Sequence, residues 1–344
     1  MKAAYFVKKG LVEAREVEDD KLEKETDAII RVIRACVCGS DLWWFRGVSN
    51  RPAGTVGHEA IGIVEAVGAK VDNVKVGDFV IAPFTHGCMK CKICKAGFDS
   101  NCPNFDYGDF KGYQAEKLLF QNASALVKIP GKPSDYTEDQ LKDFLTLADV
   151  MATGYHAAAS AEVKPGDTAA VIGDGAVGLC GVIAAKLRGA KKIILLSHHE
   201  GRAALGREFG ATDIVSERGE DAVKKVLELT DGYGADAVLE CVGASSSIDQ
   251  AGKIARAGAV VGRVGVPQKE PETNKFFWKN VGWRGGSANV TSYDREVLLD
   301  AVLKGEIHPG KVFTKSFHLD HVQEAYEAMD QREAIKSMLV VADK

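Results

Sequence analysis

Four cysteines lie within a single stretch of 15 residues, at Cys88, Cys91, Cys94 and Cys102. Four thiolates this close together can hold a tetrahedral Zn²⁺ from one short loop. Disulfide pairing fits less well, because the N-terminus does not resemble a secretory signal and the remaining cysteines stand singly: Cys36, Cys38, Cys180 and Cys241. A closed four-thiolate site leaves no position for substrate, so this spacing predicts a structural zinc.

Two shorter fragments carry donors that suit a metal with an open coordination position. They are Cys36-Val-Cys38-Gly-Ser-Asp41 and Gly57-His58-Glu59. Catalytic zinc takes three protein ligands from histidine, cysteine, aspartate or glutamate and keeps a fourth position open. A lone cysteine or histidine is often packed in a core, so each fragment alone leaves a structural role open.

A glycine-rich turn, Gly173-Asp-Gly175-Ala176-Val177-Gly178, follows a strand that ends at Ile172. It opens an apolar segment that predicts a helix over residues 176–187. The first glycine suits a tight turn, the second lets the backbone approach a pyrophosphate, and the third lets helix and strand pack closely. The helix N-terminus then faces the phosphates, so this segment, Ala176 and Val177 included, predicts a dinucleotide site.

The next strand ends at Ser197, where an NAD site usually has an acidic residue for the ribose hydroxyls. A carboxylate would repel a 2′-phosphate, whereas Ser197 with His198, His199 and Arg202 could bind one. This pattern favours NADP(H). The alternative is that the histidines are solvated and Glu200 binds the ribose, which leaves NAD(H) possible.

The surrounding segments predict the elements that position these residues. Short β-rich stretches run through residues 1–130, with strands expected over 28–37 and 60–67. Helical spacing follows over 137–161. Between residues 166 and 288, strands alternate with helices, which predicts a doubly wound parallel sheet. The expected strands there cover residues 169–172, 192–197, 237–242 and 260–266, with a further helix over 201–209.

Length and composition are consistent with two domains in a soluble enzyme-sized chain. The 344 residues exceed one ordinary core, while 46% hydrophobic and 27% charged residues are typical of globular proteins. A net charge of -4 gives no reason to expect nucleic acid or a membrane as partner. No apolar run is long enough to span a bilayer, so we expect a cytoplasmic protein.

Taken in this order and spacing, the motifs resemble the zinc-dependent alcohol dehydrogenases of the medium-chain dehydrogenase/reductase superfamily. The resemblance covers essentially the whole chain. It implies an α/β protein with a GroES-like β-rich catalytic domain, residues 1–150 and 290–344, and a Rossmann domain, residues 151–289. It also favours a homo-tetramer over a dimer.

The resemblance assigns roles to individual residues. Cys38, His58 and Asp149 would hold the catalytic zinc, as in the branch of the family that uses aspartate as third ligand. Around them it gives further roles: Ser40 accepts the alcohol proton, Asp41 orients His58, Glu59 lies beside the metal, Trp43 and Phe84 line the substrate pocket, and Lys336 contacts the coenzyme pyrophosphate. Trp43 stands where the family often has a histidine, so the proton exit differs.

The implied activity is hydride transfer between NADP(H) and a small or medium alcohol, aldehyde or ketone, with two zinc ions per subunit. One alternative is an NAD-dependent polyol or sugar dehydrogenase. Another, from a different class, is a non-catalytic nucleotide-binding protein that retains the fold. Cys38, His58, Asp149 and Ser40 argue against the last, because a protein that only binds nucleotide needs none of them.

Overall fold

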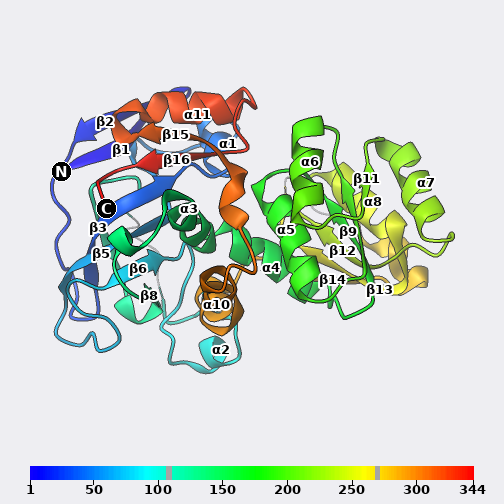
Figure 1. Ribbon diagram of the computed structural model, residues 1–344, viewed down its shortest axis with the longest axis horizontal. Coiled ribbons are helices and arrows are strands. Elements are labelled where there is room, and N and C mark those ends of the chain that lie inside the picture. The colour runs from blue at the N-terminus through cyan, green and yellow to red at the C-terminus, as the bar shows by residue number, and fades with distance from the viewer. Residues whose placement is uncertain (106–110, 268–271) are drawn as a thin grey trace. The chain divides into compact units, whose positions relative to one another are not determined.

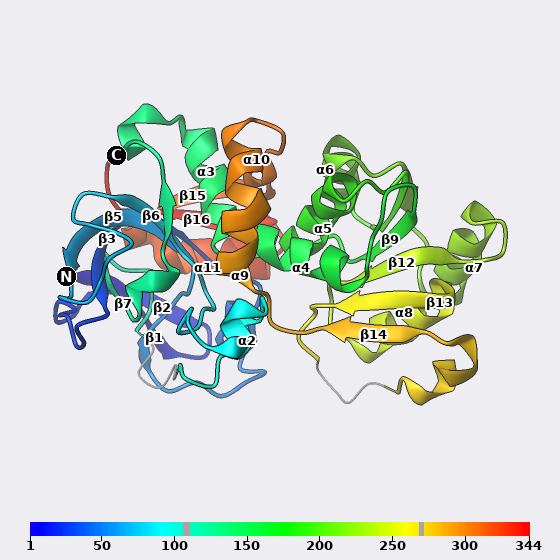
Figure 2. The same cartoon turned by 90° about the horizontal axis from the view of Figure 1, so that it is seen from below.

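A computed structural model describes residues 1–105, 111–267 and 272–344 of the chain. The chain divides into two compact units (Figures 1 and 2). Unit 1 comprises Met1–Asp149 and Asn289–Lys344, and unit 2 comprises Val150–Ala288. Each unit has its own core, and the two are described separately.

Unit 1 is built on β-sheets. Its larger sheet has the order β15-β16-β3-β5-β6-β8, with β7 also paired to β3, and a smaller sheet has the order β2-β1-β4. Pairing is antiparallel except between β15 and β16. The strands are β1 Lys2–Lys8, β2 Leu11–Glu16, β3 Ala28–Cys36, β4 Gly54–Thr55, β5 Ala60–Val67, β6 Phe79–Ala82, β7 Lys117–Phe120, β8 Val127–Ile129, β15 Phe313–His318 and β16 Lys336–Val340.

Buried apolar side chains hold the sheets of unit 1 together. Every residue of β3 except Arg31 is buried, because this central strand is covered on both faces. Helix α11 packs on β15, β16 and β2, as Figure 1 shows, and contributes Tyr326 to the core. The helices of unit 1 are α1 Asp41–Phe45, α2 Lys92–Lys95, α3 Glu138–Leu147, α9 Val290–Tyr293, α10 Leu299–Leu303 and α11 Val322–Asp330.

Unit 2 contains the predicted parallel sheet, with the strand order β11-β10-β9-β12-β13-β14. All of its strand pairs are parallel. The central strands are continuous apolar runs because both of their faces are covered. The bounds are β9 Thr168–Ile172, β10 Lys192–Leu196, β11 Asp213–Val215, β12 Ala235–Glu240, β13 Ala255–Arg263 and β14 Gly282–Gly285.

Helices cover both faces of this sheet, with α5 and α6 on one side and α7 and α8 on the other (Figure 1). The helices are α4 Val150–Ser160, α5 Ala176–Leu187, α6 Glu200–Phe209, α7 Gly219–Leu229 and α8 Ser245–Ile254. This is the α/β class expected from the sequence. Among the described residues, no helix is both long and apolar enough to cross a membrane.

The region with predicted helical spacing, residues 137–161, is divided into α3 and α4. The division falls at Ala148 and Asp149, between Leu147 and Val150. Asp149 therefore belongs to neither helix, and its side chain is buried. The junction therefore matters for the site described next.

Candidate active site

Four side chains of unit 1 bring metal-binding donors together: Cys38, His58, Glu59 and Asp149. One donor atom from each lies within 4.8 Å of all the others. They come from three distant parts of the chain, just after β3, just before β5 and at the end of α3. The structure thus assembles the three predicted ligands, together with Glu59.

Two neighbouring residues fix His58 and Cys38 in place. The Asp41 carboxylate accepts a hydrogen bond from the Cys38 backbone N–H at 3.0 Å, and its other oxygen lies 3.6 Å from His58 Nδ1. Gly57 has a φ of 91°, and a Cβ there would lie 2.3 Å from the Gln114 side chain, so only glycine fits before His58. Asp41 therefore has the position predicted for an orienting carboxylate.

The donor spacing fits one metal ion. His58 Nε2 lies 3.6 Å from Asp149 Oδ2, and Cys38 Sγ lies 3.5 Å from the same oxygen. Zinc bonds of about 2.0–2.3 Å separate tetrahedral donors by roughly 3.3–3.8 Å. Burial lowers the pKa of His58, but Asp41 and Asp149 outweigh it and raise that pKa well above its usual value. The pocket therefore favours positive charge, as a cation site must.

Glu59 is fully buried and paired with Lys336 of β16. The Lys336 Nζ donates to Glu59 Oε1 at 2.7 Å and to the Val37 carbonyl at 3.2 Å, and the lysine is 1% exposed. Glu59 Oε2 has no hydrogen-bond partner among the described residues. The Lys336 ammonium group is thus buried and engaged, and its predicted contact with a coenzyme pyrophosphate would require it to leave this pair.

Three further predicted residues surround this set. Ser40, which precedes α1, is exposed, and Trp43 in α1 is half-buried. Phe84 is also half-buried, and its ring centroid lies 5.8 Å from that of His58. The Phe84 backbone N–H donates to the Ala148 carbonyl at 3.0 Å, which holds the Phe84 backbone against the residue that precedes Asp149.

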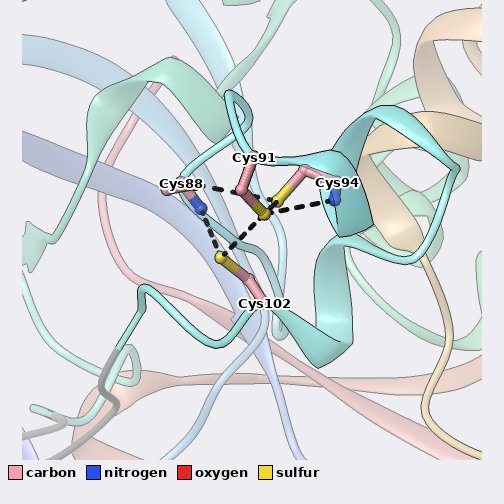
Figure 3. A group of neighbouring side chains, drawn as sticks. All are labelled: Cys88, Cys91, Cys94 and Cys102. Carbon is pink, nitrogen blue, oxygen red and sulfur yellow. Dashed lines mark hydrogen bonds between the residues drawn. The ribbon is translucent and has the colours of Figure 1, made fainter.

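The second predicted metal set is the four-cysteine loop around α2. Figure 3 shows the side chains of Cys88, Cys91, Cys94 and Cys102 turned toward one another. The sulfur atoms are separated by 3.5 Å in Cys91–Cys94, 3.8 Å in Cys91–Cys102 and 4.0 Å in Cys88–Cys94. Zinc–sulfur bonds of about 2.3 Å place tetrahedral sulfurs about 3.8 Å apart. The loop thus fits a four-thiolate zinc.

Backbone groups of the loop are directed at its sulfur atoms. The Cys88 N–H donates to Cys102 Sγ at 3.3 Å and the Cys94 N–H to Cys91 Sγ at 3.5 Å. Burial would raise the pKa of Cys88, but the N–H groups of Lys90 and Cys91 help to lower it to about 6. Burial raises the pKa of Cys94 to about 12. Backbone N–H groups that donate to sulfur, as at Cys88, stabilise the thiolate, which is the form that binds metal.

In unit 2, the glycine-rich turn has the geometry of a phosphate-binding loop. It lies between β9 and α5, with Gly175 as the N-cap of the helix. A Cβ at Gly178 would lie 1.9 Å from the Gly173 carbonyl oxygen, so the turn requires glycine there. Ala176 and Val177 form the first turn of α5, whose N–H groups are free to face an anion.

Three of the four residues predicted to bind a 2′-phosphate contact Asp174 of the glycine-rich turn instead. Ser197 is 1% exposed, and its hydroxyl donates to Asp174 Oδ2 at 2.9 Å. His199 Nδ1 lies 2.9 Å from the same oxygen, and Arg202 contacts Asp174 Oδ1 at 3.4 Å. Ser197 is therefore buried against Asp174, and its contact with a 2′-phosphate stays a prediction.

Asp174 itself was not predicted as a site residue. The sequence shows an aspartate between Gly173 and Gly175. The partners of this aspartate lie 23 to 28 positions further along the chain, and only the βαβ fold brings them together with it. Burial raises the pKa of Asp174, but hydrogen bonds from His199 and Ser197 and the charge of Arg202 outweigh it, so the net shift is downward. Asp174 is thus a stable carboxylate in the glycine loop.

A pocket of about 460 Å³ opens beside this loop. His198 is the one predicted phosphate contact among its lining residues, and its Nδ1 lies 2.6 Å from the Ser216 carbonyl. Arg218, an exposed residue directly before α7, also lines the pocket and was missed by the sequence analysis. Two acidic residues, Asp174 and Glu217, line the pocket too.

Comparison with known proteins agrees with this geometry. Residues 24–131 match the family described as alcohol dehydrogenase GroES-like domain, and residues 176–296 match zinc-binding dehydrogenase. Zinc-type alcohol dehydrogenase B of Aspergillus flavus is 33% identical, covering 95% of this chain and 78% of the relative. The NADP-dependent isopropanol dehydrogenase of Clostridium beijerinckii is 30% identical, covering 92% and 93% respectively.

Among solved structures, alcohol dehydrogenase TADH from Thermus sp. ATN1 superposes with a TM-score of 0.90 at 30% identity, covering 99% of this chain and 100% of that one. The fold and its two donor sets define a zinc-binding, nicotinamide-dependent oxidoreductase. The chain belongs to the zinc-type alcohol dehydrogenases, with a GroES-like domain and a Rossmann-like domain.

Proposed function

We propose that this alcohol dehydrogenase transfers hydride between NADP(H) and a small or medium alcohol or its aldehyde or ketone. The observation that carries the proposal is the convergence of Cys38, His58 and Asp149, with Glu59 beside them. Three such ligands leave a coordination position for a substrate oxygen. A zinc held there would polarise that oxygen and lower the pKa of an alcohol.

The chain's own residues supply the remaining steps of the proposed reaction. Asp41 holds His58 in one ring orientation through the 3.6 Å contact at Nδ1. The exposed hydroxyl of Ser40 is the proposed acceptor of the alcohol proton. Trp43 and Phe84 are the proposed apolar walls that orient the carbon bearing the hydride. Because Trp43 carries no ring nitrogen of suitable basicity, we propose that the proton leaves Ser40 through water.

The preference for NADP(H) rests on the absence of a carboxylate at the end of β10 and on two groups in the pocket. His198 and Arg218 both line it. Within the described ranges the Arg218 side chain makes no hydrogen bond or ion pair, so its guanidinium is available to a phosphate. The 30% identity to an NADP-dependent isopropanol dehydrogenase supports the same choice.

An NAD-dependent polyol dehydrogenase is the second candidate. The observation that favours it is Asp174, whose carboxylate occupies His199 and Arg202 and also lines the pocket. Glu217, beside Arg218, adds a second acidic group there. These acids oppose a 2′-phosphate, so the balance between the two candidates depends on the net charge of this pocket.

Steady-state kinetics with both coenzymes across a panel of primary alcohols, secondary alcohols and polyols would test the proposal. We expect a higher kcat/KM with NADP⁺ and the best turnover with simple alcohols. Arg218→Ala should lower kcat/KM for NADP⁺ by at least about tenfold and leave that for NAD⁺ nearly unchanged. A preference for NAD⁺ with polyols would instead support the second candidate.

We also propose a cytoplasmic homo-tetramer. All eight cysteines lie in the described residues and none forms a disulfide, which suits a reducing compartment. The strand β14 pairs with β13 on one side, and the nearby side chains Phe277 and Trp278 are 69% and 91% exposed. Exposed aromatic side chains beside a sheet edge suit a contact with another copy. Light scattering of the purified protein would distinguish a tetramer from a dimer.

A further inference from the structure

Sequence spacing places the coenzyme-contacting carboxylate of such sites at the end of β10. Here the carboxylate that contacts this position comes from the glycine loop instead. At the end of the strand stands Ser197, but its hydroxyl donates to Asp174 of the glycine loop at 2.9 Å. Asp174 also accepts from His199 at 2.9 Å and contacts Arg202 through both its side chain and its backbone carbonyl at 3.4 Å. One carboxylate therefore engages three of the four side chains that the sequence predicted for a 2′-phosphate.

The two sides of this cluster differ in exposure. Asp174 lines the 460 Å³ pocket, whereas Ser197, His199 and Arg202 do not. The Arg202 side chain is 19% exposed and the Asp174 side chain 13%, so their contact is largely shielded from solvent. The Asp174 carboxylate therefore lines the pocket, while the basic side chains that contact it do not.

This arrangement opposes a 2′-phosphate in two ways. A phosphate in the pocket meets the negative charge of Asp174, and like charges at short range repel. The guanidinium of Arg202 is also committed to Asp174, so it donates to a phosphate only if it gives up that contact. NAD(H), which lacks the 2′-phosphate, is not repelled by Asp174 and does not require Arg202 to leave it. A carboxylate can also accept hydrogen bonds from the ribose hydroxyls.

We propose that Asp174 is a specificity-determining residue of the coenzyme site, which limits the preference for NADP(H) by holding Arg202 and His199 away from the 2′-phosphate. The proposal rests on the coenzyme site assigned under the proposed function. A residue of the glycine loop, rather than one at the end of β10, then sets the ratio of the affinities for NADP(H) and NAD(H).

Coenzyme binding to the full-length enzyme tests this directly, without turnover. Dissociation constants for NADPH and NADH would be measured by coenzyme fluorescence for the wild type and for Asp174→Asn. The amide keeps the shape of the side chain and removes its charge. We expect NADPH to bind about tenfold tighter to the variant, and NADH to change little.

A second substitution shows whether the freed guanidinium is responsible. Arg202→Met in the wild-type background should change NADPH binding little, because Asp174 already occupies the arginine. The same substitution in the Asp174→Asn background should remove most of the gain, which a double-mutant cycle measures as coupling. Ser197→Ala is the matched control, since it removes one hydrogen bond to Asp174 and no charge.

Two results would overturn the proposal. One is equal change in NADPH and NADH binding on Asp174→Asn, which indicates a general effect on the loop. The other is weaker NADPH binding by the variant, which indicates that Asp174 positions the cations for the phosphate. Retained NADH binding shows that the variant is folded. A wild type that prefers NADH contradicts the proposed coenzyme but leaves the predicted change in ratio testable.

Discussion

Unit 1 buries several ionisable side chains, and some of them pair with each other. Lys336 and Glu59 are the clearest case, with side-chain exposures of 1% and 0%. Removing two charges from water is costly, and only their mutual attraction and hydrogen bonds offset that cost. The pair also places a positive charge beside donors that carry negative charge when they bind metal.

Lys336→Met is therefore expected to destabilise the protein by about 3–5 kcal/mol, because it leaves Glu59 buried without a counter-charge. Denaturant unfolding of the zinc-loaded enzyme would measure the loss. Adding Glu59→Gln to Lys336→Met should recover part of it, since the double variant has no unpaired charge. A single variant as stable as the wild type would mean that the pair contributes nothing measurable.

Sequence reasoning selected the residues whose donor atoms the fold brings together, but not the hydrogen bonds around them. Cysteines three residues apart define their own loop, so Cys88, Cys91 and Cys94 were predictable from spacing alone. Asp149 was assigned by resemblance only, because nothing local marks an aspartate between two helices as a ligand. The contacts of Asp174 and Lys336 depend on strand order, which no short segment encodes.

Among the elements, those with a strong local pattern were predicted best. The helix over 176–187 corresponds to α5, Ala176–Leu187, and the strand over 60–67 corresponds to β5, Ala60–Val67. The strand expected over 260–266 is instead β13, Ala255–Arg263, because alanine and glycine at its start have little strand preference. The short edge strand β14 was not predicted, since two of its four residues are glycine.

The four-cysteine loop is anchored to the C-terminal part of unit 1. Ser292 donates to Asp99 Oδ1 at 3.0 Å, and Ser100 donates to Asn289 Oδ1 at 2.9 Å. Asp99 lies between Cys94 and Cys102, so these contacts join the loop to α9 and to the residue before it. A zinc bound here would therefore hold together segments that are far apart in the sequence.

Cys91→Ser is expected to lose this structural zinc and to lower the melting temperature by roughly 10 °C, because metal binding contributes to folding free energy. Turnover per folded chain should remain close to that of the wild type. Differential scanning calorimetry and activity of the same sample would check both points. Cys241→Ser, outside both donor sets, is the matched control and should keep its zinc.

A selective loss of turnover in a folded Cys91→Ser enzyme would contradict this separation of roles. It would mean that the four-cysteine loop takes part in the reaction. The geometry opposes that outcome, because four sulfur donors complete a tetrahedral site and leave no position for substrate.

At the scale of the whole molecule, the metal-donor sets and the glycine loop belong to different compact units. Unit 1 holds both donor sets, and unit 2 holds the glycine loop and its pocket. The class of fold followed from the change of pattern along the chain, since alternating strands and helices begin where the glycine loop does. The substrate did not follow, because a pocket is formed by side chains from many segments.

The account as a whole depends on two zinc ions with different roles, and the zinc content per chain tests this most directly. We predict two zinc ions in the wild type by elemental analysis. Cys38→Ala should retain one and lose turnover, because it removes a ligand of the open site only. One zinc in the wild type, or a Cys38→Ala enzyme with two zinc ions and full turnover, would contradict the account.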